Sequence, residues 1–205
     1  MNNSPALRLQ KVAEAEFPTQ FGLFRIYGFE GRIASGTTER VEEAVVLKMG
    51  DLAGAAPLVR IHSQCLTGDV FHSLRCDCRA QLEIALNSIA KEGRGLLVYE
   101  HQEGRGIGLL NKLRAYELQD QGADTVEANE RLGFDSDLRS YLLPGAILQF
   151  FGLKAVRLLS NNPEKVEAVE NAGVRVTERV PCVADAIDTR EAYLRTKRDR
   201  MGHLL

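Results

Sequence analysis

The hydrophobic pattern of this chain changes from a strand period to a helix period near Cys78, and this change restricts the folds that the chain can adopt. Before that point, short runs of alternating or β-branched apolar residues predict strands at 21–29, 45–47 and 58–62. After it, apolar residues recur on one helical face between 82 and 90, and Gly93 can end that helix. The first half of the chain is therefore expected to be rich in strands, and the second half to differ from it.

The second half alternates segments that favour strands with segments that favour helices. We expect strands at 95–99, 155–159 and 174–180, and helices at 109–116, 125–132, after Pro144, at 163–173 and at 189–201. Asn162 followed by Pro163 is typical of a helix start, because the amide can cap the first turn and proline suits the first helical position. The pattern predicts an α/β fold with α+β character: a β-rich N-terminal half, then alternating strands and helices around a mixed, mainly parallel sheet.

Length and charge narrow the functional classes. With 205 residues the chain can bury a substantial core, and we expect a single domain spanning 1–205, with a surface hairpin loop at 30–40. The net charge of −2 argues against a chain that binds nucleic acid over its whole surface, so a phosphate ligand would need a local basic cluster. No apolar run approaches the roughly 18–20 residues that span a bilayer, and the N-terminus lacks the pattern of a secretory signal. We therefore expect a cytoplasmic protein with neither a membrane nor a nucleic-acid partner.

Cysteine spacing predicts a metal site. The chain has four cysteines: Cys65, Cys76, Cys78 and Cys182. The first three form a C-x10-C-x-C pattern, which in a reducing compartment favours a zinc site over disulfides. Three thiolates leave one tetrahedral position for water, as in catalytic zinc sites; a structural site would be closed by a fourth ligand, for which His62 and His72 are the candidates. Spacing alone favours the structural site, and we expect Cys182 to be a small buried side chain.

A glycine-rich turn at 103–108 separates a predicted strand from a predicted helix. Glycines there allow backbone N–H groups to approach phosphate oxygens at a helix N-terminus. The alternatives are a tight turn without a ligand and a dinucleotide site that uses Asp124, which lies 20 positions after Gly104. Basic residues near expected loops could grip a triphosphate. They are Arg60, Arg75, Arg105, Arg139 and Lys165.

Several segments, in this order and over nearly the whole chain, resemble the GTP cyclohydrolase II family. They are RIHSQCLTGD at 60–69, LRCDC at 74–78 with Gln81, QEGRGIGLLNK at 102–112, AYELQDQG at 115–122, DTVEAN at 124–129, LGF at 132–134, DLR at 137–139, NNP at 161–163 and the ending 197–205. Each segment alone is modest evidence, whereas all of them in this order are highly specific.

The resemblance implies the zinc-dependent hydrolysis of GTP, the first step of riboflavin biosynthesis. The imidazole ring is opened at C8, formate and pyrophosphate are released, and the product is 2,5-diamino-6-(5-phosphoribosylamino)pyrimidin-4(3H)-one. Cys65, Cys76 and Cys78 would hold one catalytic Zn²⁺ per subunit, Mg²⁺ would accompany the triphosphate, and the enzyme would be a homodimer. Asp137 would be the proton acceptor, and Arg139 would attack the α-phosphorus. Because the pKa of arginine exceeds about 12, electrostatic stabilisation of the transition state is the other role open to Arg139.

The resemblance also implies a set of GTP contacts. They are Arg60, Ile61, His62, Ser63, Gln64, Gln81, Glu103, Gly104, Arg105, Thr125, Ser160 and Lys165. Tyr116 would lie near the base or pack in the core. Three positions depart from the family pattern: Gln64 stands in place of a glutamate, His101 in place of an arginine, and Ser160 in place of a threonine.

Three other functions remain open from the sequence. A related hydrolase of purine nucleotides could give another product, given Gln64 and His101. A non-catalytic zinc module would need a closed site and neither Asp137 nor Arg139. An oxidoreductase of the NAD type would use the glycine turn and Asp124.

Overall fold

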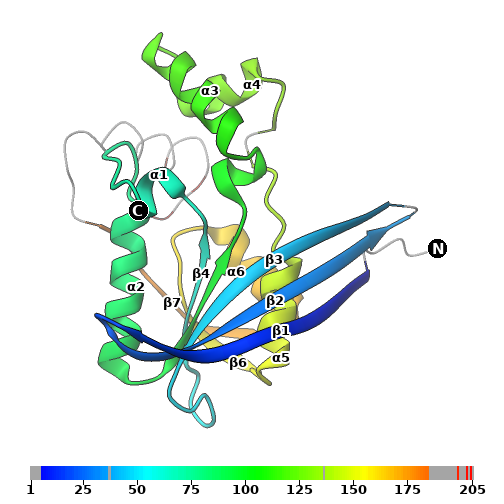
Figure 1. Ribbon diagram of the computed structural model, residues 1–205, viewed down its shortest axis with the longest axis vertical. Helices are drawn as coiled ribbons and strands as arrows, with labels where there is room; N and C mark the ends of the chain where they lie inside the picture. Colours follow the sequence, from blue (N-terminus) through cyan, green and yellow to red (C-terminus); the bar gives the residue numbers. More distant parts are fainter. Residues whose placement is uncertain are drawn as a thin grey trace.

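The structure is a computed structural model that describes residues 6–36, 38–135, 137–184, 198, 202 and 204. In these residues one seven-stranded sheet forms the centre of the molecule, in the order β1-β2-β3-β5-β4-β6-β7 (Figure 1). The strands are β1 (Ala6–Thr19), β2 (Gly22–Ser35), β3 (Thr38–Met49), β4 (Leu58–Ser63), β5 (Gly95–Glu100), β6 (Ala155–Leu159) and β7 (Arg175–Val180). The helices are α1 (Leu66–Asp69), α2 (Cys78–Glu92), α3 (Leu109–Asp120), α4 (Thr125–Arg131), α5 (Leu142–Phe150) and α6 (Pro163–Asn171), with a 3-10 turn η1 (Glu103–Gly106).

The sheet is antiparallel on one side and parallel on the other. β1, β2, β3 and β5 pair antiparallel in succession, whereas β5, β4, β6 and β7 pair parallel. The N-terminal strands form a long curved arm, and their far end extends beyond the helices (Figure 1). The predicted β-rich half, followed by alternating strands and helices in a mixed sheet, is confirmed, and the parallel pairs are confined to the second part of the sheet.

The expected loop at 30–40 is wrong in extent, although the hairpin itself is present. β2 continues to Ser35 and β3 begins at Thr38, with the turn at Gly36. Burial of Ile33 in the core supports this extension. Gly31 permits it, because a Cβ there would lie 2.8 Å from Leu143 Cδ1 of helix α5. β1 was not predicted from the sequence, because its side chains are mostly exposed and therefore carry little alternation.

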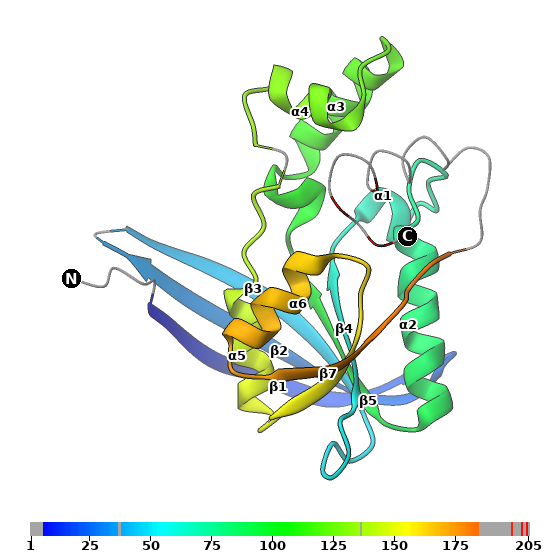
Figure 2. The ribbon, with the colours of Figure 1, turned by 180° about the vertical axis from the view of Figure 1, so that it is seen from behind.

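Helices cover both faces of the parallel strands. α2 lies on one face, and α5 and α6 lie on the other (Figure 2). Two apolar clusters fill these layers: Ala85, Leu86 and Ile89 of α2 pack in one, and Leu143 and Ile147 of α5 in the other. The chain leaves β4 through α2 to reach β5, and it reaches β6 on the opposite side of β4. Such a reversal of strand order opens a crevice at the carboxyl ends of the strands, where ligands of α/β proteins bind.

Local signals placed most helix ends. Gly93 ends α2 in the left-handed conformation with a φ of 68°. Asn162 caps α6, where its side chain accepts a hydrogen bond of 3.0 Å from the backbone N–H of Glu164. The helix expected at 189–201 lies outside the described residues, apart from Arg198. In the described part of the chain, no helix has the length and apolar character needed to cross a membrane.

Candidate active site

A pocket lies at the carboxyl ends of β4, β5 and β6 and is bordered by η1, α3 and the start of α4. Most residues that the family resemblance indicated line it together. They are Arg60, His62, Ser63, Gln64, Cys65, Cys76, Cys78, Gln81, Glu103, Gly104, Arg105, Tyr116, Thr125, Arg139, Ser160 and Lys165. Ile61 and Asp137 do not line the pocket: Ile61 is a core residue, and Asp137 lies behind Arg139.

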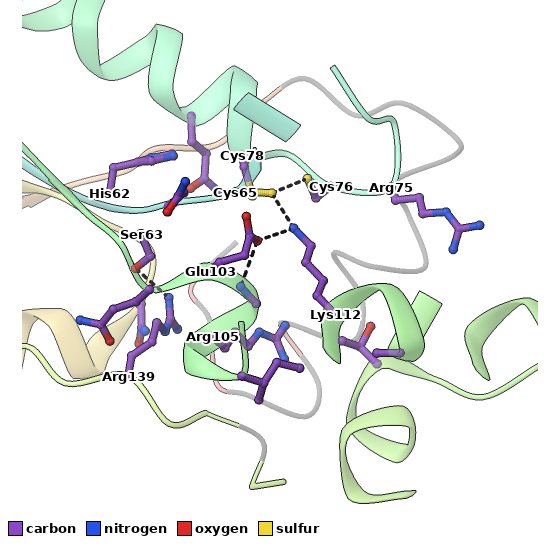
Figure 3. Close-up of a pocket in the computed structure, with 18 of the residues that line it drawn as sticks. His62, Ser63, Cys65, Arg75, Cys76, Cys78, Glu103, Arg105, Lys112 and Arg139 are labelled. Carbon is purple, nitrogen blue, oxygen red and sulfur yellow. Dashed lines mark hydrogen bonds and ion pairs between the residues drawn. The ribbon is translucent and has the colours of Figure 1, made fainter. Parts of the chain in front are cut away.

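The three clustered cysteines meet at one wall of the pocket (Figure 3). Their sulfur atoms lie within 4.8 Å of one another, and the Cys65 and Cys76 sulfurs are 3.6 Å apart. Zinc–sulfur bonds of about 2.3 Å in a tetrahedron require sulfurs about 3.8 Å apart. Cys65 follows β4, and Cys78 begins α2. The donor set and its spacing therefore fit a zinc ion.

No histidine completes this cluster among the described residues, where the candidate metal group consists of the three cysteines alone. His62 Nε2 lies 3.2 Å from each carboxylate oxygen of Asp69, and His72 is exposed. Within the described part of the chain, no fourth ligand closes the site. Three thiolates that open onto a pocket match a catalytic zinc site with a free position.

The thiols share protons unequally. The pKa of Cys65 is far below its usual value, because its thiolate accepts hydrogen bonds from Cys76 and Cys78 and lies beside Lys112. The same hydrogen bond raises the pKa of Cys76 to about 11. A divalent cation would replace the two remaining protons, since only deprotonated sulfur binds zinc.

Asp69 fixes the first cysteine and the neighbouring histidine. Its buried carboxylate accepts hydrogen bonds from the Cys65 backbone N–H at 3.0 Å and from the Tyr99 hydroxyl at 2.8 Å. The His62 ring stacks on Tyr99 with centroids 5.5 Å apart. This network holds the end of β4 rigid beside the metal group.

The stability of the folded protein is expected to depend on pH through the protonation of His62. Burial lowers the pKa of His62, and the hydrogen bond to Asp69 opposes this shift. The unfolded chain binds a proton on this histidine below about pH 6.5, whereas the folded protein does not until the pH is lower. The free energy of unfolding should therefore decrease from about pH 7 to about pH 5, by at most about 1.4 kcal/mol per pH unit from this group. Urea unfolding across this range should give a shallower dependence for His62→Gln; equal slopes would contradict the assignment.

Gly68 makes the cysteine cluster possible. A Cβ at this position would lie 2.8 Å from Cys76 Sγ and 3.0 Å from Cys65 Sγ, closer than real Cβ contacts. We expect Gly68→Ala to separate the sulfurs, to reduce zinc content and to cost about 1–3 kcal/mol of stability through overpacking. Metal analysis and thermal unfolding measure both effects.

Gly28→Ala is the matched control for this substitution. It adds the same methyl group to β2 at a point where nothing lies within 4 Å. Full zinc content in Gly68→Ala, with stability equal to that of Gly28→Ala, would show that the close approach has no role in the metal site.

The glycine turn holds Arg105 in an uncommon backbone conformation and leaves its guanidinium without hydrogen-bond partners at both terminal nitrogens. Gly104 and Arg105 have φ values of 62° and 61°, a left-handed conformation that is uncommon for arginine. Both terminal guanidinium nitrogens of Arg105 are buried without a hydrogen-bond partner, although the side chain lines the pocket. A positive, unpartnered fork of this kind suits an anionic oxygen. The dinucleotide alternative is excluded at Asp124, which instead forms a capping box with Glu127 at the start of α4.

Two further basic side chains, Arg139 and Lys165, line the pocket. Arg139 binds Asp137 through both carboxylate oxygens, and its guanidinium is 3.3 Å from Ser63 Oγ. Lys165 Nζ donates to Ile61 O at 2.9 Å and to Ser63 Oγ at 3.2 Å. Burial opposes the charge of Arg139, but the hydrogen bonds that it donates to Asp137 raise its pKa above the usual value. Burial, and then the charge of Arg139, hold the pKa of Lys165 well below its usual value.

A buried hydrogen-bond chain fixes the amide of Gln81. Its oxygen accepts from Arg60 at 2.6 Å, and its nitrogen donates to Asp77 at 2.5 Å. Arg60 also donates to Leu159 O at 3.0 Å. The orientation of the amide is therefore set before any ligand binds, which suits a group that reads the donor and acceptor edge of a base.

The remaining predicted positions differ in their environments. Thr125 is the first residue of α4, and Ser160 bonds the backbone of Asn162. The Tyr116 hydroxyl lies 3.1 Å from Thr67 Oγ1. His101 is outside the pocket lining, 3.8 Å from Glu43. Cys182 is fully buried, as expected.

Several residues that line the pocket were not predicted from the sequence. Polar examples are Gln102, Lys112, Asn129 and Asn161, and Arg75 was considered only as one basic residue among others. Gln102 and Asn161 could have been found, since each lies just after a parallel strand, at the edge where ligands bind. Lys112 gave no such signal.

Comparison with known proteins identifies the family. The sequence model described as GTP cyclohydrolase II matches residues 10–181. The chain is 52% identical over 200 residues to the GTP cyclohydrolase-2 of Proteus mirabilis, covering 97% of this chain and 98% of the relative. It shows the same identity to the enzymes of that name from Yersinia pseudotuberculosis and Escherichia coli, over 97% of this chain and 99% of each relative. The pocket combines the three clustered thiols, the glycine turn with the unpartnered Arg105, and the basic side chains of Arg139 and Lys165. The chain that forms it belongs to the GTP cyclohydrolase II family.

Proposed function

We propose that this chain is a GTP cyclohydrolase II that hydrolyses GTP, opens its imidazole ring at C8 and releases formate and pyrophosphate. The observation that carries the proposal is the position of the three-thiol cluster opposite the Arg105 fork, in one pocket. The two ends of that pocket offer different chemistry, a soft metal site and an anion site. A purine nucleoside triphosphate needs both, one for its base and one for its phosphates.

Cys65, Cys76 and Cys78 would hold the zinc ion, one per subunit. Bound there, zinc supplies a Lewis acid that activates water near neutral pH. Gln81 would bind the base, and its fixed contacts with Arg60 and Asp77 in the pocket lining support this role. Gln64 lies in the lining directly before Cys65, so an amide stands beside the metal group.

The triphosphate, with Mg²⁺, would extend toward the basic wall. Arg105 offers two free guanidinium nitrogens, and Arg139 and Lys165 converge on Ser63 Oγ. Three basic side chains in a partly buried pocket can offset the charge of the phosphates better than exposed ones would. His62, Glu103, Gly104, Thr125 and Ser160 complete the proposed contacts in the lining.

Asp137 is proposed to accept a proton and Arg139 to act at the α-phosphate. Burial opposes ionisation of Asp137, but its hydrogen bonds from Arg139 lower its pKa, so the carboxylate is charged and carries no proton of its own. We expect Asp137→Asn to lower the rate of product formation by about 100-fold or more, within the usual contribution of general acid–base groups. Turnover equal to wild type would remove this role.

The decisive test supplies zinc-loaded protein with GTP and Mg²⁺ and follows formate, pyrophosphate and the purine absorbance separately. We expect all three signals to change together. Pyrophosphate without formate would indicate a nucleotide hydrolase with another product. Tight GTP binding without turnover would contradict an enzyme of this class. Light scattering on the same sample tests the proposed homodimer, which the family resemblance implies.

A further inference from the structure

Lys112 lies between the cysteine cluster and the glycine turn. It projects from α3, its side chain is 12% exposed, and its ammonium contacts two groups (Figure 3). Nζ lies 3.1 Å from Cys65 Sγ and 2.7 Å from Glu103 Oε1. The Tyr116 ring centroid is 5.8 Å away. A buried lysine with a thiolate as one acceptor calls for a reason beyond solubility.

The local backbone is arranged so that this lysine can reach the sulfur. A Cβ at Gly104 would lie 3.2 Å from Lys112 Cβ, so the glycine turn packs directly on the lysine stem. Glu103 is held by two backbone donors, Leu66 N at 2.6 Å and Gly104 N at 3.0 Å. The carboxylate is therefore a fixed anchor for the ammonium, and the anchor itself is tied to the segment that follows Cys65.

The charges explain what the lysine does there. Three thiolates around a divalent zinc leave one net negative charge, which is costly in a buried site unless a cation lies beside it. The described residues place Lys112 in contact with Cys65 Sγ, and no hydrogen bond joins it to Cys76 or Cys78. An N–H donor on one thiolate weakens the electron donation of that sulfur to a bound metal.

Given the zinc site of the proposed function, we infer that Lys112 is a positioning residue of the metal centre. It compensates the charge of the three-thiolate group, reduces donation from Cys65 and so keeps the metal a strong Lewis acid. Its second hydrogen bond locks Glu103, and with it the glycine turn, to the metal wall of the pocket. Its role is therefore distinct from that of Arg105, Arg139 and Lys165, which face the phosphates.

Cobalt in place of zinc provides a test that does not depend on turnover. Co²⁺-loaded wild type should show sulfur-to-cobalt charge-transfer absorption, because cobalt accepts the same thiolate ligands. In Lys112→Met this band should move to longer wavelength, since a sulfur without its hydrogen-bond donor gives up electrons more readily. Lys112→Arg, which retains charge and donors, should move the band back toward wild type. The control Arg114→Met removes an exposed cation from the same helix and should leave the spectrum unchanged.

Kinetics on the zinc enzyme separate the alternatives. We expect Lys112→Met to lower kcat by about 10- to 100-fold, the usual effect of losing an outer partner of a metal ligand, with a smaller change in KM. A raised KM with an unchanged cobalt spectrum would assign the lysine to GTP binding and overturn the inference. Lower thermal stability with an unchanged spectrum would show that Lys112 only contributes to packing, and it would also overturn the inference. Should Lys112→Met not fold, Lys112→Leu, which also lacks the donor and the charge, takes its place and should give the same direction of shift. If the wild type did not bind cobalt, the zinc site of the proposed function would be wrong. If the wild type bound cobalt and Lys112→Met left the spectrum unchanged, only the inference about Lys112 would be wrong.

Discussion

Replacing Cys76 by serine should abolish formate release from GTP and remove most of the bound zinc. Cys76 Sγ is 3.6 Å from Cys65 Sγ and is buried, so no other donor among the described residues can take its place. Zinc binding by structural sites with four ligands is worth about 10–16 kcal/mol, so one ligand carries about 2.5–4 kcal/mol, or about 100- to 1000-fold in affinity. A serine hydroxyl is a harder and less acidic ligand that does not restore this energy.

Metal content and formate release measured on the same sample test this expectation. Cys182→Ala is the matched control, because Cys182 is also buried but packs against α2 residues in the core, outside the metal group. That variant should retain one zinc per subunit. A Cys76→Ser protein with full zinc content and normal turnover would contradict a catalytic metal held by the three cysteines.

Local patterns predicted the parts of the fold that depend on neighbours in sequence. The cap at Asn162, the helix end at Gly93 and the strand of apolar residues at 95–99 all depend on interactions within a few residues. β1 escaped prediction because its stability comes from backbone pairing with β2 while its side chains stay exposed. Periodicity reports burial, and a strand without a buried face gives no such signal.

In the candidate site, too, the sequence predicted the groups of residues that are close together along the chain and not the contacts between distant segments. The spacing of Cys65, Cys76 and Cys78 indicated a metal, but spacing alone favoured a closed structural site. In the structure His62 is held by Asp69 in the core, so it is not a fourth ligand and the three-cysteine group stays open to the pocket. Lys112 could not be found from sequence, since 47 residues separate it from the sulfur that it contacts. Only the fold brings the start of α3 against the end of β4.

Arg139 is the other position at which a single substitution should have a large effect. Its fork binds Asp137 with two hydrogen bonds of 2.8 and 3.1 Å from Nε, and it also reaches Ser63 Oγ. Lysine retains the charge but cannot reproduce a planar fork with several donors. We expect Arg139→Lys to lower the rate of pyrophosphate release by about 100- to 1000-fold, the usual loss when one electrostatic donor to a transition state is removed. Arg157→Lys, at an exposed arginine paired with Glu92 and Glu178, is the control and should keep normal rates.

The two proposed roles of Arg139 predict different chemistry at this position. A nucleophile must present a free lone pair, and guanidinium has none until it loses a proton. The hydrogen bonds that Arg139 donates to Asp137 raise the pKa of Arg139 even though burial opposes it, so the protonated form is favoured in this site. A fixed positive fork instead stabilises charge that develops on the α-phosphate, without any change in protonation. Rapid denaturation of the wild type during turnover of GTP labelled at the α-phosphorus should therefore leave no label on the protein. Stoichiometric label on wild type, absent from the Asp137→Asn and Arg139→Lys variants, would establish the covalent role and reject the electrostatic one.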